Sequence, residues 1–215
     1  MLMVIREFRT AFDKAALINK RLAPRAQGED FVSLDDIVAA VKQVSNFSKI
    51  SVNRQSFSDL NIPDNLKKAG AMLSTMTSIN EVSKEEEKIA NIVINSDYSA
   101  NMQRFSVVHE LGHLICEVPN FSYEKIDDGK FTISTHINPD ITFIQEELCR
   151  KHKYLIAEQV ANIFALLVLI PDSIRIKDIK TEGIDSLMDK YGVTEDAIYS
   201  RMLLSNVKVP ETPNT

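Results

Sequence analysis

The segment from Phe105 to Val118, FSVVHELGHLICEV, limits the possible folds more than any other part of the chain. It is mostly apolar, yet it contains two of the four histidines, His109 and His113, four residues apart. In an α-helix each residue advances by about 100°, so two side chains at this spacing project from nearly the same side. The segment therefore predicts a helix, starting near Met102, that carries either two incidental histidines in a core or half of a metal site.

The spacing of His109, Glu110 and His113 matches the His-Glu-x-x-His motif of zinc hydrolases. The two imidazoles can reach one ion, and Glu110 lies close enough to act as a general base toward a water without being a ligand. Gly112 costs about 1 kcal/mol relative to alanine inside a helix. We expect a glycine at this position if another backbone or a substrate approaches closely.

A catalytic zinc usually takes three protein ligands and leaves a fourth position for water. The third histidine of the metzincin pattern is absent, because Pro119 occupies its place. Four alternatives remain: Cys116, His136, His152 and an acid on a later helix. A thiol on a packed helix is more often part of a core, and the two histidines have exposed-looking neighbours. Glu158 begins a strongly apolar stretch, where an unpaired carboxylate is costly and a metal would satisfy it.

The remaining pattern predicts an α+β fold. Helical spacing or capping residues indicate helices near the amino terminus, after Ser33, over 141–170 until Pro171, over 184–190 and over 194–204. Short β-prone runs predict strands that begin at Lys49, Ala71 and Ile89. We expect a small three-stranded sheet, mixed or antiparallel, packed against the His-Glu-x-x-His helix and a second long helix. The charged run 80–88 predicts a solvated loop, and Asp128-Gly129 predicts a hairpin over 120–140.

Composition restricts the classes of function. The 215 residues are 44% hydrophobic, which suits one domain with a small appendage. We expect an amino-terminal helical segment over 1–32, a main domain over 33–205 and a flexible tail over 206–215. A net charge of −5 and a pI near 5.5 argue against direct nucleic-acid binding. The chain has only two cysteines, and the apolar run at its amino terminus is too short for the core of a signal peptide. It also has no apolar run long enough to cross a membrane, so we expect a cytoplasmic protein without a membrane segment.

Two stretches together resemble a known family. RFSVVHELGH (Arg104 to His113) and EQVANIFALLVLIP (Glu158 to Pro171) are similar to the paired motifs R-F-T-x-A-H-E-x-G-H and E-x-x-A-N-x-F-A-x-x-L-L-x-P of the ImmA/IrrE zinc metallopeptidases. Ser106 and Val108 depart mildly from the pattern. IANIVIN and YGVTEDAIYSRMLL resemble the family more weakly, so that the resemblance covers about residues 33 to 205.

The resemblance implies a zincin-like fold with one zinc ion. His109, His113 and Glu158 would be its ligands, and Glu110 would be the catalytic base. Asn162 would hydrogen-bond a ligand histidine, although an amide that merely packs between helices is the alternative. Arg104 also matches, and a structural role at the helix entry suits it. The oxyanion donor stays open among Tyr98, Tyr123 and Tyr154.

The implied function is a zinc-dependent endopeptidase that hydrolyses a peptide bond in a specific cytoplasmic protein. By the same resemblance, that protein is a helix-turn-helix transcriptional repressor of a mobile element or stress response. We expect the peptide to bind as an extra strand along Ile89 to Asn95. The segment from 117 to 157 is longer than expected for the family and holds the predicted hairpin, which leaves the cleft wall and the substrate specificity open. Two alternatives are a zinc-stabilised regulatory or protein-interaction module without turnover and an ordinary α+β domain without metal.

Overall fold

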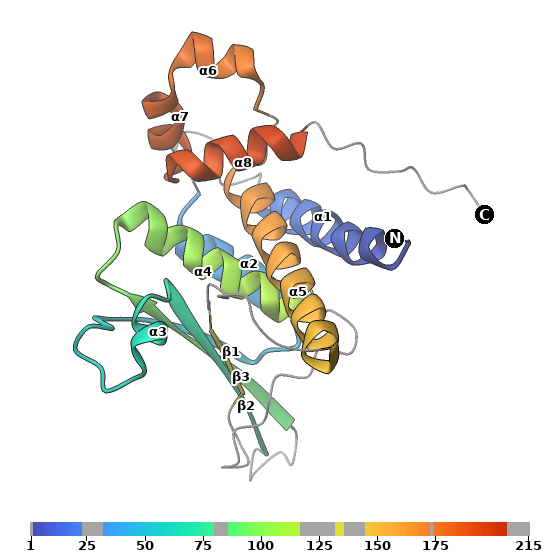
Figure 1. Cartoon of the computed structure of the whole chain (residues 1–215), viewed down its shortest axis with the longest axis vertical. Coiled ribbons are helices and arrows are strands. Elements are labelled where there is room, and N and C mark those ends of the chain that lie inside the picture. The colour runs from blue at the N-terminus through green and yellow to red at the C-terminus, as the bar shows by residue number, and fades with distance from the viewer. Residues whose placement is uncertain are drawn as a thin grey trace.

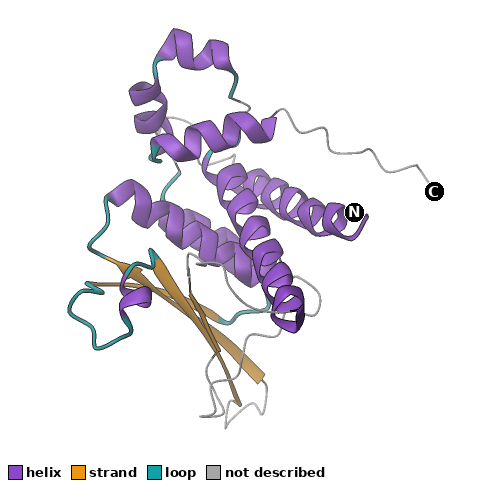
Figure 2. Cartoon of the chain, in the orientation of Figure 1, coloured by secondary structure: helices purple, strands orange, loops and turns teal. Residues whose placement is uncertain are grey.

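The computed structural model describes residues 2–22, 32–79, 86–116, 132–135, 145–172 and 174–205. The helices are α1 (Leu2–Leu22), α2 (Leu34–Val44), α3 (Asp64–Lys67), α4 (Ala100–Ile115), α5 (Gln145–Leu169), α6 (Ile176–Glu182), α7 (Ile184–Tyr191) and α8 (Glu195–Ser205). The strands are β1 (Lys49–Gln55), β2 (Ala71–Ile79), β3 (Glu86–Asn95) and β4 (Thr132–Thr135). The long helices lie together on one side of the sheet (Figure 1; Figure 2). The predicted α+β, zincin-like class is confirmed.

The sheet is mixed, with strand order β1-β3-β2-β4. β3 pairs parallel with β1 and antiparallel with β2, and β4 pairs antiparallel with β2. Ala90, Ile92 and Ile94 alternate along β3 and are buried, as expected for the strand face that packs against helices. β4 is an addition to the three predicted strands.

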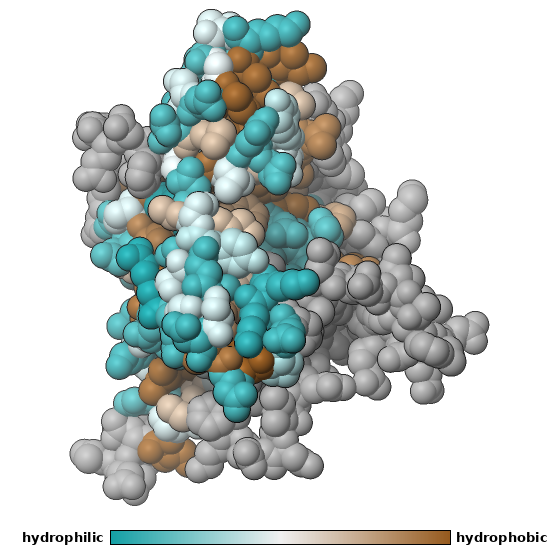
Figure 3. Space-filling view, turned by 60° about the vertical axis from the view of Figure 1, so that its left-hand side comes forward, coloured by the Kyte–Doolittle hydropathy of each residue, from teal (hydrophilic) through white to brown (hydrophobic). Residues whose placement is uncertain are grey.

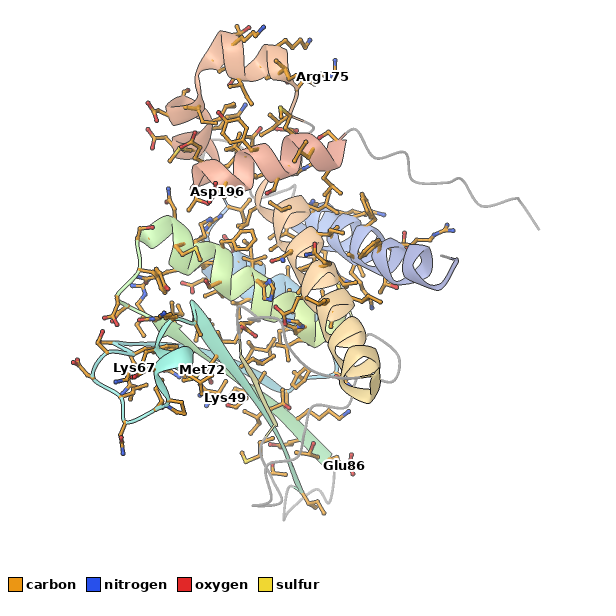
Figure 4. The ribbon with its side chains drawn as sticks, viewed as in Figure 1. Lys49, Lys67, Met72, Glu86, Arg175 and Asp196 are labelled. Carbon is orange, nitrogen blue, oxygen red and sulfur yellow. The ribbon has the colours of Figure 1, made fainter. Side chains whose placement is uncertain are left out.

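The position of β3 corrects one expectation. Both sides of this strand are already hydrogen-bonded, since Lys49 to Gln55 pair on one side and Ala71 to Ile79 on the other. No peptide can add a strand along Ile89 to Asn95, so the predicted docking edge is wrong. Glu86 marks the end of β3 that lies farthest from the helices (Figure 4).

Side-chain caps fix where two of the helices begin. The Ser33 hydroxyl accepts a hydrogen bond from the Asp36 backbone N–H at 3.1 Å, which confirms the predicted start of α2. The Ser99 hydroxyl accepts from the Met102 N–H at 3.3 Å. α4 thus begins at Ala100, slightly before the predicted start near Met102.

The amino-terminal helix is part of the core. Ala11, Ala15, Ile18 and Leu22 form its buried stripe at helical spacing, and α1 packs along α5. The Asn19 side chain donates to the Leu167 carbonyl at 2.8 Å. That carbonyl would otherwise accept from the residue four positions later, which is a proline without an N–H. α1 therefore completes the hydrogen bonding at the carboxyl end of α5.

The three carboxy-terminal helices follow α5. α7 and α8 were predicted, whereas α6 was not. Arg201 is buried and donates from Nε to the Ile170 carbonyl at 2.9 Å, which joins α8 to the end of α5. Burial lowers the pKa of Arg201, although the charges of Asp172 and Tyr191 oppose this. Gly192, in the left-handed conformation with φ 61°, ends α7.

The described surface is largely hydrophilic on the face drawn in Figure 3, with apolar atoms gathered at the top, where the carboxy-terminal helices lie. Large apolar side chains exposed on these helices are Ile176, Tyr199 and Leu203. Among the described residues, no helix has both the length and the apolar character needed to cross a membrane.

Several predictions fall outside the described residues. β4 lies in the second arm of the predicted hairpin over 120–140, and the other arm is not described. Most of the charged run 80–88, His136, Tyr123 and the predicted tail over 206–215 also lie outside the described residues.

Candidate metal centre

The turn between β3 and α4 is held by one buried asparagine. Asn95 accepts from the backbone N–H groups of Phe57 at 3.3 Å and Asp97 at 3.1 Å. Its amide nitrogen donates to the carbonyls of Lys67 at 3.1 Å and Ala69 at 3.0 Å. Four backbone groups from three segments are thereby fixed where the chain leaves the sheet and enters α4. Sequence reasoning missed Asn95, whose only signal was a polar residue at the end of an apolar strand.

α4 is buried along most of its length. From Arg104 to Cys116, only Phe105 and His113 are not classed as buried. Arg104 donates to the Val32 carbonyl, which ties the segment before α2 to α4, and burial lowers the pKa of this guanidinium to about 10. The structural role expected for Arg104 matches this contact.

Gly112 allows α4 and α5 to approach closely. A Cβ atom at this position would lie 3.0 Å from the Ala161 Cα, 3.2 Å from the Ala161 carbonyl oxygen and 3.1 Å from Cδ1 of Phe164. The predicted close approach of a second backbone is confirmed, and that backbone is α5. The side chains of the two helices fill the space between them (Figure 4). This contact brings the residues on either side of Ala161 next to the histidines of α4.

Three residues with possible ligand atoms converge between α4 and α5. His109 Nε2 lies 2.9 Å from His113 Nε2 and 3.2 Å from Glu158 Oε2. His113 Nε2 lies 3.1 Å from Glu158 Oε1. One ligand atom from each of these residues falls within 4.8 Å of the others. The Glu158 side chain is 13% exposed, and those of His109 and His113 are 0% and 3% exposed.

Asn162 determines the orientation of the first histidine. Its side-chain oxygen lies 2.8 Å from His109 Nδ1. Because an amide oxygen can only accept, His109 Nδ1 carries the proton and donates it. When a metal ion takes the place of the second proton, the ring is neutral and its lone pair lies on Nε2, the atom that faces His113 and Glu158.

Glu158 is ionised in this environment. Burial disfavours its charged form, but the hydrogen bonds and charges of His109 and His113 outweigh burial and hold the pKa of Glu158 far below the usual range of a carboxyl group. An anionic oxygen therefore stands beside two imidazole nitrogens.

This set of atoms fits a divalent metal ion. Two imidazole nitrogens and one carboxylate oxygen are ligands that zinc accepts, at about 2.0–2.2 Å from the ion. In a tetrahedron of that size the ligand atoms are about 3.3 Å apart. The two imidazole nitrogens are 2.9 Å apart, and each lies 3.1–3.2 Å from a different oxygen of the Glu158 carboxylate, distances close to this value. The three lone pairs would repel at such distances unless a proton or a cation lay between them.

The other candidates stand apart from this cluster or are not described. Cys116 caps the end of α4 and is buried, and burial raises the pKa of its thiol to about 12. His152 and Tyr154 lie on α5, but the positions of their side chains are not described. The Tyr98 hydroxyl donates to the Lys68 carbonyl at 2.9 Å. Glu110 is 0% exposed on α4, next to His109.

Comparison with known protein families matches the part of the chain that contains this site. The family model described as IrrE N-terminal-like domain, Peptidase_M78, matches residues 59–203, which is more than half of the chain and includes both motifs. A search of curated proteins finds no match. A member of a peptidase family is expected to act on a protein. The chain therefore belongs to the Peptidase_M78 metallopeptidases, the ImmA/IrrE family that its two motifs resemble.

Proposed function

We propose that this chain is a zinc-dependent endopeptidase that hydrolyses a peptide bond in a specific cytoplasmic protein, a helix-turn-helix transcriptional repressor of a mobile element or stress response. The observation that carries the proposal is the convergence of His109, His113 and Glu158 from two helices, with Glu158 at least 45 residues after the histidines in sequence. The predicted domain over 33–205, with a helical segment before it, is part of this proposal.

The proposed ligands of one zinc ion are His109 Nε2, His113 Nε2 and the Glu158 carboxylate. Three protein ligands are typical of catalytic zinc sites, whereas structural sites usually have four. Zinc bound in this way supplies Lewis acidity, which lowers the pKa of a water molecule to about 7. The negative charge of Glu158 balances half the charge of a divalent ion inside the core.

The proposed base is Glu110. Glu110 directly follows His109 on α4, which supports this role. It would take the proton from the attacking water and then give it to the leaving amine. Asn162 would keep the proton of His109 on Nδ1, so that Nε2 keeps its lone pair.

The choice of a repressor as substrate rests on the family resemblance and is supported by charge. The chain carries a net charge of −5. DNA-binding proteins carry an excess of Lys and Arg, so an acidic protease and a basic repressor attract each other at a distance. The match to a peptidase family and the His-His-Glu geometry support hydrolysis, because a purely structural zinc site needs no adjacent base.

Two measurements test the proposal. Elemental analysis of protein purified without added metal should find about one zinc per chain, and the His113→Ala variant should lose it. Incubation with the helix-turn-helix repressor encoded nearest to this gene should give two fragments from one cut. Glu110→Gln should retain zinc and lose cleavage, and Glu195→Gln, an exposed glutamate on α8, should behave as wild type.

The outcomes separate the alternatives. Stoichiometric zinc without cleavage of any repressor would favour the module that uses zinc for stability and does not turn over. Absence of bound metal would favour an ordinary α+β domain. A Glu110→Gln variant that cleaves at the wild-type rate would remove Glu110 from the mechanism while leaving the metal site intact.

A further inference from the structure

A hollow lies at the carboxyl end of α4, beyond His113. Its volume is about 380 Å³. It is lined by Thr10 and Lys14 of α1, by Val44–Asn46 at the end of α2, and by Leu114 and Ile115 of α4. Hollows of about 300–1,000 Å³ are the size that small molecules occupy in proteins. A hollow of this kind therefore has room for a ligand of several carbon atoms.

The lining combines one cation, Lys14, with the polar residues Thr10, Ser45 and Asn46 and the apolar residues Val44, Leu114 and Ile115. Lys14 is half-buried, and among the described residues it forms no ion pair. The nearest acid along the helix, Asp13, is paired with Arg9 at 3.8 Å. The described lining residues include no acidic side chain. Lys14 itself lines the hollow. An ammonium group in such a place attracts an anion.

The apolar part of the lining and the helix ends refine the ligand. Val44, Leu114 and Ile115 offer aliphatic surface, which an inorganic anion cannot use. α2 ends at Val44 and α4 at Ile115, so the carbonyl ends of both helices, each equivalent to about half a negative charge, lie at the hollow. An inorganic anion would therefore bind this hollow more weakly than a molecule that joins a carboxylate to an aliphatic body.

Two walls of the hollow come from outside the family match. Thr10, Lys14 and Val44–Asn46 precede residue 59, where the match begins, whereas Leu114 and Ile115 follow directly after His113. A ligand in this hollow would thus touch the last turn of the helix that carries the proposed metal ligands. The same ligand would also contact Thr10, Lys14 and Val44–Asn46, which lie outside the matched domain.

We propose that this hollow binds a small carboxylate with a short aliphatic body, and that the bound molecule stabilises the last turn of α4. The carboxylate pairs with Lys14, and the aliphatic body packs on Leu114 and Ile115. Two sources share this chemistry, a free aliphatic amino acid and a short fatty acid. The hollow is then a regulatory site in contact with α4, the helix that carries His109 and His113.

Isothermal calorimetry on the full chain tests the proposal with three probes of the same carbon skeleton. L-leucine and 4-methylpentanoate both carry the carboxylate, and 4-methylpentan-1-ol lacks it. Both carboxylates should bind saturably, and the affinity of the alcohol should be lower by about tenfold or more. Tighter binding of L-leucine would assign the site to amino acids, because its ammonium group faces the helix ends, and tighter binding of 4-methylpentanoate would assign it to fatty acids.

Variants of α1 test the role of the cation. Lys14→Met should weaken both carboxylates about tenfold and leave the alcohol within about twofold. Lys14→Arg keeps the charge and should retain binding, and Lys20→Met, an exposed lysine of the same helix, should match wild type. In hydrogen exchange, amides of the last turn of α4 should exchange more slowly when L-leucine or 4-methylpentanoate is bound.

The proposal is overturned if the alcohol binds as tightly as the carboxylates, if no probe saturates below about 10 mM, or if Lys14→Met binds like wild type. If the hydrogen-exchange rates of the α4 amides do not change upon binding, the ligand does not stabilise the last turn of α4. None of these measurements uses a substrate or the metal, so their failure is distinguishable from failure of the proposed peptidase activity.

Discussion

Gly112→Ala tests whether the close contact of α4 and α5 holds the metal centre together. Alanine should stabilise an isolated helix by about 1 kcal/mol relative to glycine. In this chain the new Cβ would lie 3.0 Å from the Ala161 Cα and 3.2 Å from its carbonyl oxygen. Backbone atoms cannot rotate away as a flexible side chain can. The two helices must therefore separate by about half an ångström to restore ordinary van der Waals distances.

The expected magnitude follows from these opposing effects. Overpacking of a tight core costs about 1–3 kcal/mol, and contact with backbone atoms belongs to the upper part of that range. After the gain in helix propensity, the free energy of unfolding should fall by about 1–2 kcal/mol. For a chain of this size, each kcal/mol lowers the melting temperature by about 2–4 °C. Separation of the helices also moves Glu158 and Asn162 away from His109, so zinc affinity should fall as well.

Denaturant unfolding with a chelator present measures the change in the free energy of unfolding without a contribution from bound metal. A competition titration with a zinc indicator measures the change in zinc affinity. Ser200→Ala, at an exposed position of α8, is the control for added helix propensity without overpacking and should be neutral or slightly stabilising. A Gly112→Ala protein as stable as wild type, with the same zinc affinity, would refute the close-contact reasoning.

Three further predictions concern single side chains. Asn162→Ala should weaken zinc binding about 10–100-fold in the same titration, because the His109 ring loses its orientation, while the free energy of unfolding measured with chelator changes much less. Arg201→Met should lower the free energy of unfolding by about 2–3 kcal/mol in denaturant, since the Ile170 carbonyl loses its charged donor; an equal stability would contradict this role. The pKa of Cys116 is raised from 9.0 to about 12, so at pH 8 the thiolate is about a thousandfold rarer in the folded chain than in the unfolded one. Iodoacetamide should therefore modify Cys116 only upon unfolding, as peptide mass spectrometry can show, and rapid labelling of the native protein would refute its burial.

Local spacing was enough to predict several features from the sequence. His109 and His113 share one side of a helix because four residues make about one turn, and no tertiary contact is needed for that inference. The Ser33 cap, the end of α5 before Pro171 and the starts of β1 and β2 likewise depend on neighbours in sequence. The glycine at 112 indicated a close approach, although the sequence did not say what approached.

The sheet order could not be read from local patterns. The stretch Ile89 to Asn95 of β3 is largely apolar whether it lies at an edge or in the centre, so nothing in its sequence excluded an open edge. Its central place depends on β1, which is more than 30 residues earlier in the chain, pairing parallel to it. α6 was missed because its seven residues include no buried side chain and so lack an apolar stripe.

The sequence by itself determined half of the candidate site, namely two imidazoles and an adjacent carboxylate on one helix. Only the tertiary structure brought Glu158 to 3.1 Å and 3.2 Å from those imidazoles and placed Asn162 against His109. The physical reason is that the distance between α4 and α5 is set by backbone packing at Gly112 and Ala161. A metal centre assembled from two helices depends on that distance, and a linear pattern of residues does not contain it.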